Sequence, residues 1–189
     1  MQPIVLASKS PRRKQLLTWA EIPFEVIVKD TDESFPSDLA MEEVPVFIAH
    51  NKALAVRQEV VEHRIILAAD TVVVLDDEII GKPTDAADAM RTLQKLSGKS
   101  HRVITGVVLR RGDIVHAFSD ITTVAFHALT NDQITYYIEK YQPYDKAGAY
   151  AIQEWIGVVG IASVSGDFYN VMGLPISRLV KALQLLQTS

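Results

Sequence analysis

The 189-residue sequence contains no cysteine. It therefore has no disulfide, no thiolate zinc site and no cysteine nucleophile. No apolar run is long enough to span a bilayer. Basic residues do not predominate either, because 19 Lys and Arg are set against 23 Asp and Glu, for a formal charge of −4. Since a nucleic-acid coat needs a net basic surface, we expect neither a nucleic-acid partner nor a membrane partner.

The sequence motifs of several large enzyme classes are also missing. There is no GxxxxGK[ST] and no GxGxxG, so neither a Walker-type nor a Rossmann-type phosphate-binding loop is supported. No G-x-S-x-G motif is present, which disfavours acyl transfer by a serine nucleophile. The five histidines show no metal-ligand spacing. Any phosphate or metal chemistry must therefore rest on Lys, Arg, Asp and Glu.

What is present is the composition of a globular protein. Hydrophobic residues make up 48% of the chain and charged residues 22%. The length fits one domain, and we expect a single domain over residues 1–189 with no internal repeat and no linker. The first residues place a short apolar stretch before their charges, the reverse of a signal peptide. Together with the absence of cysteine, this predicts a cytoplasmic protein.

Local patterns predict alternating strands and helices, with hairpins in the middle of the chain. Strands are expected at residues 3–7, 24–28, 65–69, 72–75, 78–80, 101–111, 114–127 and 156–164. Helices are expected after Ser10 and Pro11, within 42–62, from Thr84 or Asp85 to Gly98, from a Thr130 capping box to about Tyr141, and over 176–186. This order is typical of an α/β fold with a mixed sheet.

The start of the first expected helix breaks a local rule. A helix N-terminus carries partial positive charge and unpaired N–H groups, and ordinary helices place acidic residues there. This chain instead places four cations around that turn: Lys9, Arg12, Arg13 and Lys14. Such charges oppose the helix dipole by roughly 0.3–1 kcal/mol each where exposed, and a bound polyanion reverses that effect. The alternatives are a phosphate-binding turn and a solvated basic turn.

Further candidates are scattered through the first half of the chain. Asp70 follows a strongly apolar strand, a position that in α/β sheets often faces a ligand, although a turn-capping Asp fits equally. Lys82 lies between Gly81 and Pro83, which restrict its backbone. Glu33 belongs to an acidic turn suited to Mg²⁺ or Mn²⁺, or to solvent alone. Lys52 lies in an expected helix among small residues, where an exposed lysine is the ordinary alternative.

Taken together, these segments resemble the Maf family of nucleoside triphosphate pyrophosphatases over essentially the whole chain. The matching segments are LASKSPRRKQLL, Glu33, HNKA, AADTVV, IIGKP, AGAYAIQ and SGDFYNVMGLP. The resemblance implies an α/β fold with an elongated, bent mixed sheet flanked by helices. It also implies two lobes with a central cleft, similar to the inosine triphosphatase fold, and a homodimer.

The resemblance further implies roles for individual residues in a metal-dependent hydrolysis to monophosphate and pyrophosphate. Asp70 would be the general base, and Glu33 would act with it on water and on a divalent metal, Mg²⁺, Mn²⁺ or Co²⁺. Which of the two carboxylates activates the water stays open. The phosphates would be held by Ser8, Arg12, Arg13, Lys52 and Lys82. Arg12, Thr71 and Gln153 match the branch of the family that prefers dTTP and UTP.

The chemistry of Gln153 agrees with that branch. Its planar amide offers one donor group and one acceptor, which complement the adjacent carbonyl and N3–H of uracil and thymine. Cytosine has no N3–H, and an unpaired buried amide costs about 1–3 kcal/mol. We therefore expect UTP and dTTP to be preferred over CTP.

Two other functions remain open at this level. The run FEVIVKDTDES is similar to the D-x-D opening of haloacid-dehalogenase-like phosphatases, where the first Asp is the nucleophile and orthophosphate is released. Maf-like proteins are also linked to arrest of septum formation, so a non-catalytic nucleotide-binding regulator is the other alternative. The physiological substrate also stays open between UTP itself and modified pyrimidine nucleotides.

Overall fold

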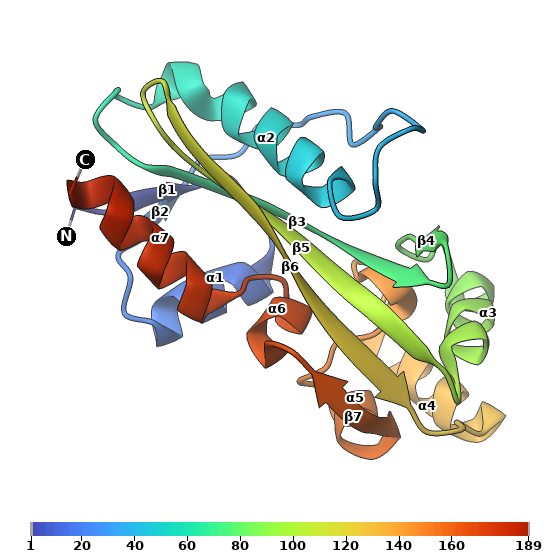
Figure 1. Cartoon of the computed structure of the whole chain (residues 1–189). Helices are drawn as coiled ribbons and strands as arrows, with labels where there is room; N and C mark the ends of the chain where they lie inside the picture. Colours follow the sequence, from blue (N-terminus) through green and yellow to red (C-terminus); the bar gives the residue numbers. More distant parts are fainter. Residues whose placement is uncertain (1, 189) are drawn as a thin grey trace. The chain divides into compact units, whose positions relative to one another are not determined.

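The computed structural model describes residues 2–188 as a mixed α/β structure (Figure 1). Its seven strands are β1 (Ile4–Leu6), β2 (Phe24–Val26), β3 (Ile66–Leu75), β4 (Glu78–Ile80), β5 (Ser100–Arg111), β6 (Ile114–Phe126) and β7 (Ile161–Ser165). They form one sheet of order β2-β1-β3-β5-β6-β7, with β4 paired to β3. β1 pairs in parallel with β2 and β3, whereas β3–β4 and β6–β7 are antiparallel. The predicted α/β class with a mixed sheet is confirmed.

The helices connect these strands. They are α1 (Pro11–Trp19), α2 (Val44–Val56), α3 (Ala86–Leu96), α4 (Asn131–Tyr141), α5 (Trp155–Gly160), α6 (Phe168–Met172) and α7 (Ile176–Thr188), with two 3₁₀ turns, η1 (Arg57–Glu59) and η2 (Ala147–Ala149). No helix in the described part of the chain has the length and apolar character needed to cross a bilayer.

The chain divides into two compact units. The first contains the residues up to Asp70, Thr105–Asp120 and the chain from Gly173 onward. The second contains Thr71–Ile104 and Ile121–Met172. Strands β3, β5 and β6 each contribute residues to both units. The expected single domain, the elongated and bent sheet and the central cleft stay predictions.

In the first unit, α2 packs on the sheet through small residues. A core cluster of eight buried side chains joins β1, α2, β3 and β5, and its members are Val5, Ala7, Ala49, Ala53, Val56, Ile66, Ala68 and Val108. Gly106 on β5 lets the start of α2 come close, because a Cβ there would lie 2.2 Å from the Val46 backbone nitrogen. The alanines and this glycine thus fix the position of α2 on the sheet.

In the second unit, α3 packs against α4 and η2. Both helices have strong N-caps: Asp85 accepts a hydrogen bond from the Asp88 N–H, and Thr130 forms the predicted capping box with Gln133. The second unit also contains a buried aromatic group in which His101 stacks on Phe126 and meets the edge of Tyr150. The His101 and Tyr150 side chains are also joined by a hydrogen bond of 2.7 Å.

Two sequence predictions are wrong. Residues 65–69 and 72–75 were expected as separate strands divided at Asp70, but β3 runs through Asp70 and Thr71 without a break. Residues 156–164 were expected as one strand, but the first part forms helix α5 and only Ile161–Ser165 is a strand. The apolar run satisfies either structure, and close packing decides for the helix, since a Cβ on Gly157 would meet the Ile152 carbonyl oxygen at 1.8 Å.

Candidate active site

The basic turn before α1 is held by its own serines. Ser10 is the N-cap, and its hydroxyl accepts a hydrogen bond from the Arg13 N–H at 3.4 Å. The buried Ser8 hydroxyl accepts from the Ser10 N–H at 3.2 Å. These bonds fix the turn that follows β1, and the predicted cap at Ser10 with Pro11 in the first turn is confirmed.

Arg13 is buried, unlike an ordinary residue of a basic turn. Only 7% of it is exposed. Its Nε donates to the Gly173 carbonyl at 2.8 Å, and Nη1 donates to the Ser8 hydroxyl at 3.0 Å. Arg13 thus ties the turn after β1 to the chain between α6 and α7. Two of its donor atoms serve this structural purpose, which the sequence pattern alone did not indicate.

Lys52 joins the two acidic candidates of the first unit. Its Nζ lies 2.7 Å from Asp70 Oδ1 and 2.7 Å from Glu33 Oε1. The side chains of Lys52 and Asp70 are only 16% and 14% exposed, whereas that of Glu33 is 48% exposed. Because α2 is fixed on the sheet, Lys52 reaches the mid-point of β3, where Asp70 lies. The ordinary alternative of an exposed lysine is wrong.

Electrostatics connect this ion pair to the basic turn. Burial lowers the pKa of Arg13, the Asp70 carboxylate raises it, Arg12 lowers it and Glu33 raises it. Arg12, Glu33 and Asp70 therefore all act on the Arg13 guanidinium. The first unit thus brings together six of the predicted site residues: Ser8, Arg12, Arg13, Glu33, Lys52 and Asp70.

The second unit holds the other three predicted residues, on segments that meet at Gly148. The Gly148 N–H donates to the Gly81 carbonyl at 3.1 Å, beside Lys82. A Cβ on Gly148 would touch Val73, two residues after Thr71 on β3. Gly148 has a φ of +71°, which favours glycine. Gln153 follows five residues later, with an exposed side chain, and Lys82 is also exposed.

The sequence as a whole decides the family. Residues 3–186 match the family of Maf-like proteins. The chain belongs to the Maf family. A protein of Bacteroides fragilis called dTTP/UTP pyrophosphatase is 47% identical over 184 residues, which cover 97% of this chain and 95% of the relative. One of the same name from Cytophaga hutchinsonii is 48% identical over 181 residues, or 96% of this chain and 83% of the relative.

Solved structures of more distant proteins are also similar to this Maf chain. The Ham1 protein of Staphylococcus aureus superposes with a TM-score of 0.45 at 15% identity, covering 66% of this chain and 72% of that one. A HAM1 protein from Coxiella burnetii gives a TM-score of 0.45 at 14% identity, with 67% and 73% covered.

The acidic pair of this Maf protein fits a divalent cation that brings further ligands with it. Glu33 and Asp70 converge on one point, the Lys52 ammonium. Within residues 2–188, no group of three or more His, Cys, Asp or Glu side chains could hold a metal. Mg²⁺ commonly takes one or two carboxylates and completes its shell with water and phosphate oxygens. The donor set therefore suits a cation whose remaining ligands are water or phosphate oxygens.

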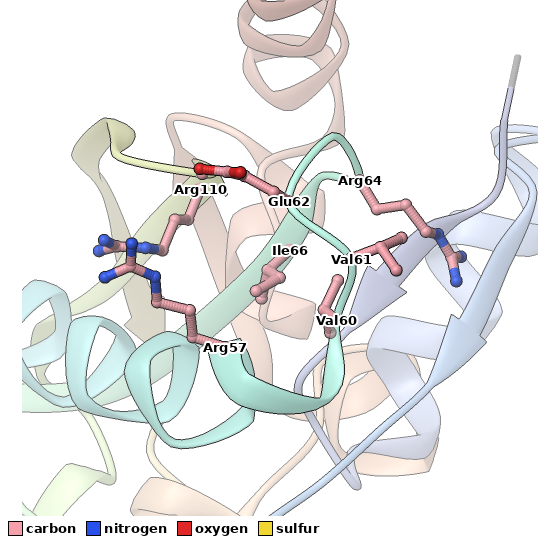
Figure 2. A pocket seen from close by; sticks show the side chains of 8 residues that line it. Arg57, Val60, Val61, Glu62, Arg64, Ile66 and Arg110 are labelled. Atoms are coloured by element: carbon pink, nitrogen blue, oxygen red, sulfur yellow. The ribbon is translucent and has the colours of Figure 1, made fainter.

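A hollow of about 160 Å³ also lies in the first unit of the Maf chain, away from the predicted site residues (Figure 2). It is lined by Arg57, Val60, Val61, Glu62, Arg64, Ile66, Arg110 and Gly112. All three of its arginines are ion-paired, Arg57 and Arg110 with Asp113 and Arg64 with Glu25. Its charge is thus balanced within the fold, and we assign it no function.

Several residues that shape the Maf site escaped the sequence analysis. The Gly173 carbonyl that holds Arg13 belongs to the quoted SGDFYNVMGLP segment, but nothing in the spacing indicates that contact. Tyr137, Lys146 and Glu154, which contact the Gln153 segment, were also missed. The burial of Lys146, in the segment DKAGAYAIQ, would have marked it as a structural residue, but that burial is known only from the fold.

Proposed function

We propose that this Maf-family chain is a pyrophosphatase that hydrolyses dTTP and UTP to the monophosphate and pyrophosphate. The observation that carries the proposal is the group formed by Lys52, Asp70 and Glu33 beside the buried Arg13. The group places the carboxylates of Asp70 and Glu33 beside the cations Lys52 and Arg13. Hydrolysis of a phosphate anhydride requires a base for water and positive charge that stabilises the phosphates. The names of the relatives from Bacteroides and Cytophaga support the choice of substrate.

Asp70 is the residue best placed to act as general base. It is only 14% exposed, and one of its oxygens, Oδ1, is oriented by Lys52. In the reaction, Asp70 takes a proton from water as the water oxygen attacks phosphorus. The anhydride bond between the α- and β-phosphates breaks, and pyrophosphate leaves with the bonding electrons. Glu33 forms an ion pair with the same Lys52, and its side chain is exposed to solvent. This position suits Glu33 to bind a water molecule or a cation.

The remaining residues bind the substrate. Arg12, Lys52 and Lys82 offset the charge of the triphosphate, and the Ser8 turn, held by Arg13, orients it. Glu33 and Asp70 would hold a divalent cation, Mg²⁺, Mn²⁺ or Co²⁺, which supplies charge neutralisation and a lower pKa for water. In the base-binding part, Gln153 pairs with the carbonyl and N3–H of the pyrimidine, with Arg12 and Thr71 beside the substrate.

Pyrophosphate release from a panel of nucleoside triphosphates tests the proposal. With a divalent metal we expect turnover of UTP and dTTP, at least tenfold lower kcat/KM on CTP because of the unpaired Gln153 amide, and pyrophosphate as the product. Orthophosphate as the first product would instead indicate the D-x-D phosphatase alternative. Equal kcat/KM values on CTP and UTP would contradict the proposed recognition of the base by Gln153.

Replacement of the general base tests the mechanism. We expect Asp70→Asn to retain nucleotide binding and to lose at least about 100-fold in turnover, the usual scale for a general base. Asp77→Asn is the matched control, since Asp77 lies exposed in the β3–β4 turn. Unchanged turnover in Asp70→Asn would remove Asp70 from the mechanism.

Other parts of the proposal rest on the sequence alone. They are the homodimer, the cytoplasmic location, the action on modified pyrimidine nucleotides and the link to division arrest. Tight nucleotide binding by the native chain, with no turnover of any triphosphate, would favour the non-catalytic regulator.

A further inference from the structure

The segment that carries Gln153 is held more firmly than an exposed loop normally is. Gln153 itself is exposed, but Ala151 and Ile152 before it are only 5% exposed each. The Glu154 N–H closes a turn onto the Ala151 carbonyl at 3.1 Å. After the turn, α5 packs so closely that Gly157 leaves no room for a Cβ beside the Ile152 carbonyl. The backbone on both sides of Gln153 is therefore fixed.

A single buried hydroxyl bridges the two ends of this turn. Tyr137 on α4 is fully buried, and its hydroxyl accepts a hydrogen bond from the Ala151 N–H at 3.1 Å. The same hydroxyl donates to Glu154 Oε2. One tyrosine thus contacts the residue two before Gln153 and the residue directly after it.

A buried cation completes the arrangement. Lys146 is 7% exposed, and its Nζ lies 3.6 Å from Glu154 Oε1 and 2.8 Å from Asp145 Oδ1. The Glu154 carboxylate is therefore held on one oxygen by Tyr137 and approached on the other by Lys146. The exposed Gln153 amide is therefore carried by a backbone that is fixed on both sides. Little conformational freedom is lost when a ligand binds such a group, so it is preorganised for recognition.

We propose that Tyr137 and Glu154 are positioning residues for base recognition, which hold the Gln153 amide at the angle needed to pair with uracil or thymine. This inference rests on the proposed function and deepens it. Neither residue touches the substrate. Each acts by fixing the peptide of Gln153, so its loss should impair discrimination between bases more than it impairs phosphate binding or hydrolysis.

The test compares kcat/KM for UTP and CTP in Tyr137→Phe, which removes only the bridging hydroxyl. We expect the UTP-to-CTP ratio to fall about tenfold, chiefly through a higher KM for UTP with kcat little changed. Tyr136→Phe is the matched control. It removes a hydroxyl from the same helix, one that accepts a hydrogen bond from Lys140, and it keeps the ring that packs on Trp155. Its ratio should equal that of the native chain.

Two variants of Glu154 keep the test decisive if Tyr137→Phe folds poorly. Glu154→Gln retains an acceptor oxygen for the Tyr137 hydroxyl and should keep most of the preference for UTP over CTP. Glu154→Ala has no such acceptor and should lose that preference. A purely structural role predicts equal losses on UTP and CTP and an unchanged ratio in every variant. That result would overturn the inference.

Gln153→Ala separates this inference from the proposed function. Suppose that the native chain prefers UTP over CTP and that Gln153→Ala loses this preference. If Tyr137→Phe and Glu154→Ala keep it, the positioning role alone is wrong. If Gln153→Ala leaves the ratio unchanged, the reading of the base by Gln153 is wrong, and the positioning role fails with it. Loss of the ratio in all three variants supports both.

Discussion

Lys52 shows how one residue can connect a fold to its chemistry. Its ammonium lies within 2.7 Å of both Glu33 and Asp70, although Asp70 is 18 positions away in the chain. The single positive charge of the ammonium lies between the two carboxylates and offsets part of their mutual repulsion. A triphosphate and its cation compete for the same groups. In the proposed reaction, Lys52 therefore exchanges partners between carboxylate and phosphate.

His101 gives a prediction at the residue scale. Burial lowers its pKa from 6.5 to about 4, so the folded chain keeps it neutral where the unfolded chain binds a proton. Stability is therefore fully present above pH 6.5 and is lost as the pH falls toward 4. By this linkage the free energy of unfolding should be about 2 kcal/mol lower at pH 5 than at pH 7.

Chemical denaturation at the two pH values measures this loss. His101→Gln removes the titrating ring and keeps a polar group facing the Tyr150 hydroxyl, which is the present partner of His101. We expect this variant to be less stable at pH 7 and to show a smaller pH dependence. A pH dependence as large as that of the native chain would exclude His101 as its source.

At the scale of elements, the approach of α2 to β5 controls where Lys52 lies. The first turn of α2 passes over Gly106, where a Cβ would lie 2.2 Å from the Val46 nitrogen and 2.3 Å from the Pro45 carbonyl carbon. These are backbone atoms, which cannot rotate away as a side chain can. The helix would have to shift, and Lys52 would shift with it.

Gly106→Ala tests this dependence. We expect a loss of about 1–3 kcal/mol in the free energy of unfolding, the usual cost of overpacking, and a lower kcat on UTP. Denaturation and steady-state kinetics measure the two effects. Gly81→Ala is the control for stability, because a Cβ there meets nothing within 4 Å. A Gly106→Ala protein as stable as the native chain would contradict the close packing of α2.

At the scale of the whole molecule, the nine predicted site residues are divided between the two compact units. Six predicted residues belong to the first unit, and Thr71, Lys82 and Gln153 belong to the second. A nucleotide that binds the folded chain and not the unfolded chain stabilises the fold by mass action.

The Asp70→Asn chain allows this stabilisation to be measured with slow turnover. At 100 times its dissociation constant, UTP with Mg²⁺ should add about 2.7 kcal/mol, or roughly 5–10 °C in the unfolding temperature of a chain of this size. CTP at the same concentration should give a smaller shift. Equal shifts with UTP, CTP and inorganic triphosphate would show that the base is not recognised.

Local signals in the sequence determined much of the architecture. Ser10 with Pro11, the Thr130 capping box, the turn at Gly112 and the alternation of elements all act within a few residues, so they can be interpreted without the fold. The same holds for the family segments, which match nearly the whole chain.

Tertiary structure decided what depends on distant neighbours. An apolar run can be a buried strand or a helix, and packing at Gly157 chose the helix. Arg13 is a structural tie because Gly173, 160 positions later, presents its carbonyl to it. Lys52 contacts Glu33 and Asp70 because α2 packs closely on β5. Hydrogen bonds and ion pairs act over only a few ångströms, so partners far apart in sequence are chosen by packing, and local composition cannot specify them.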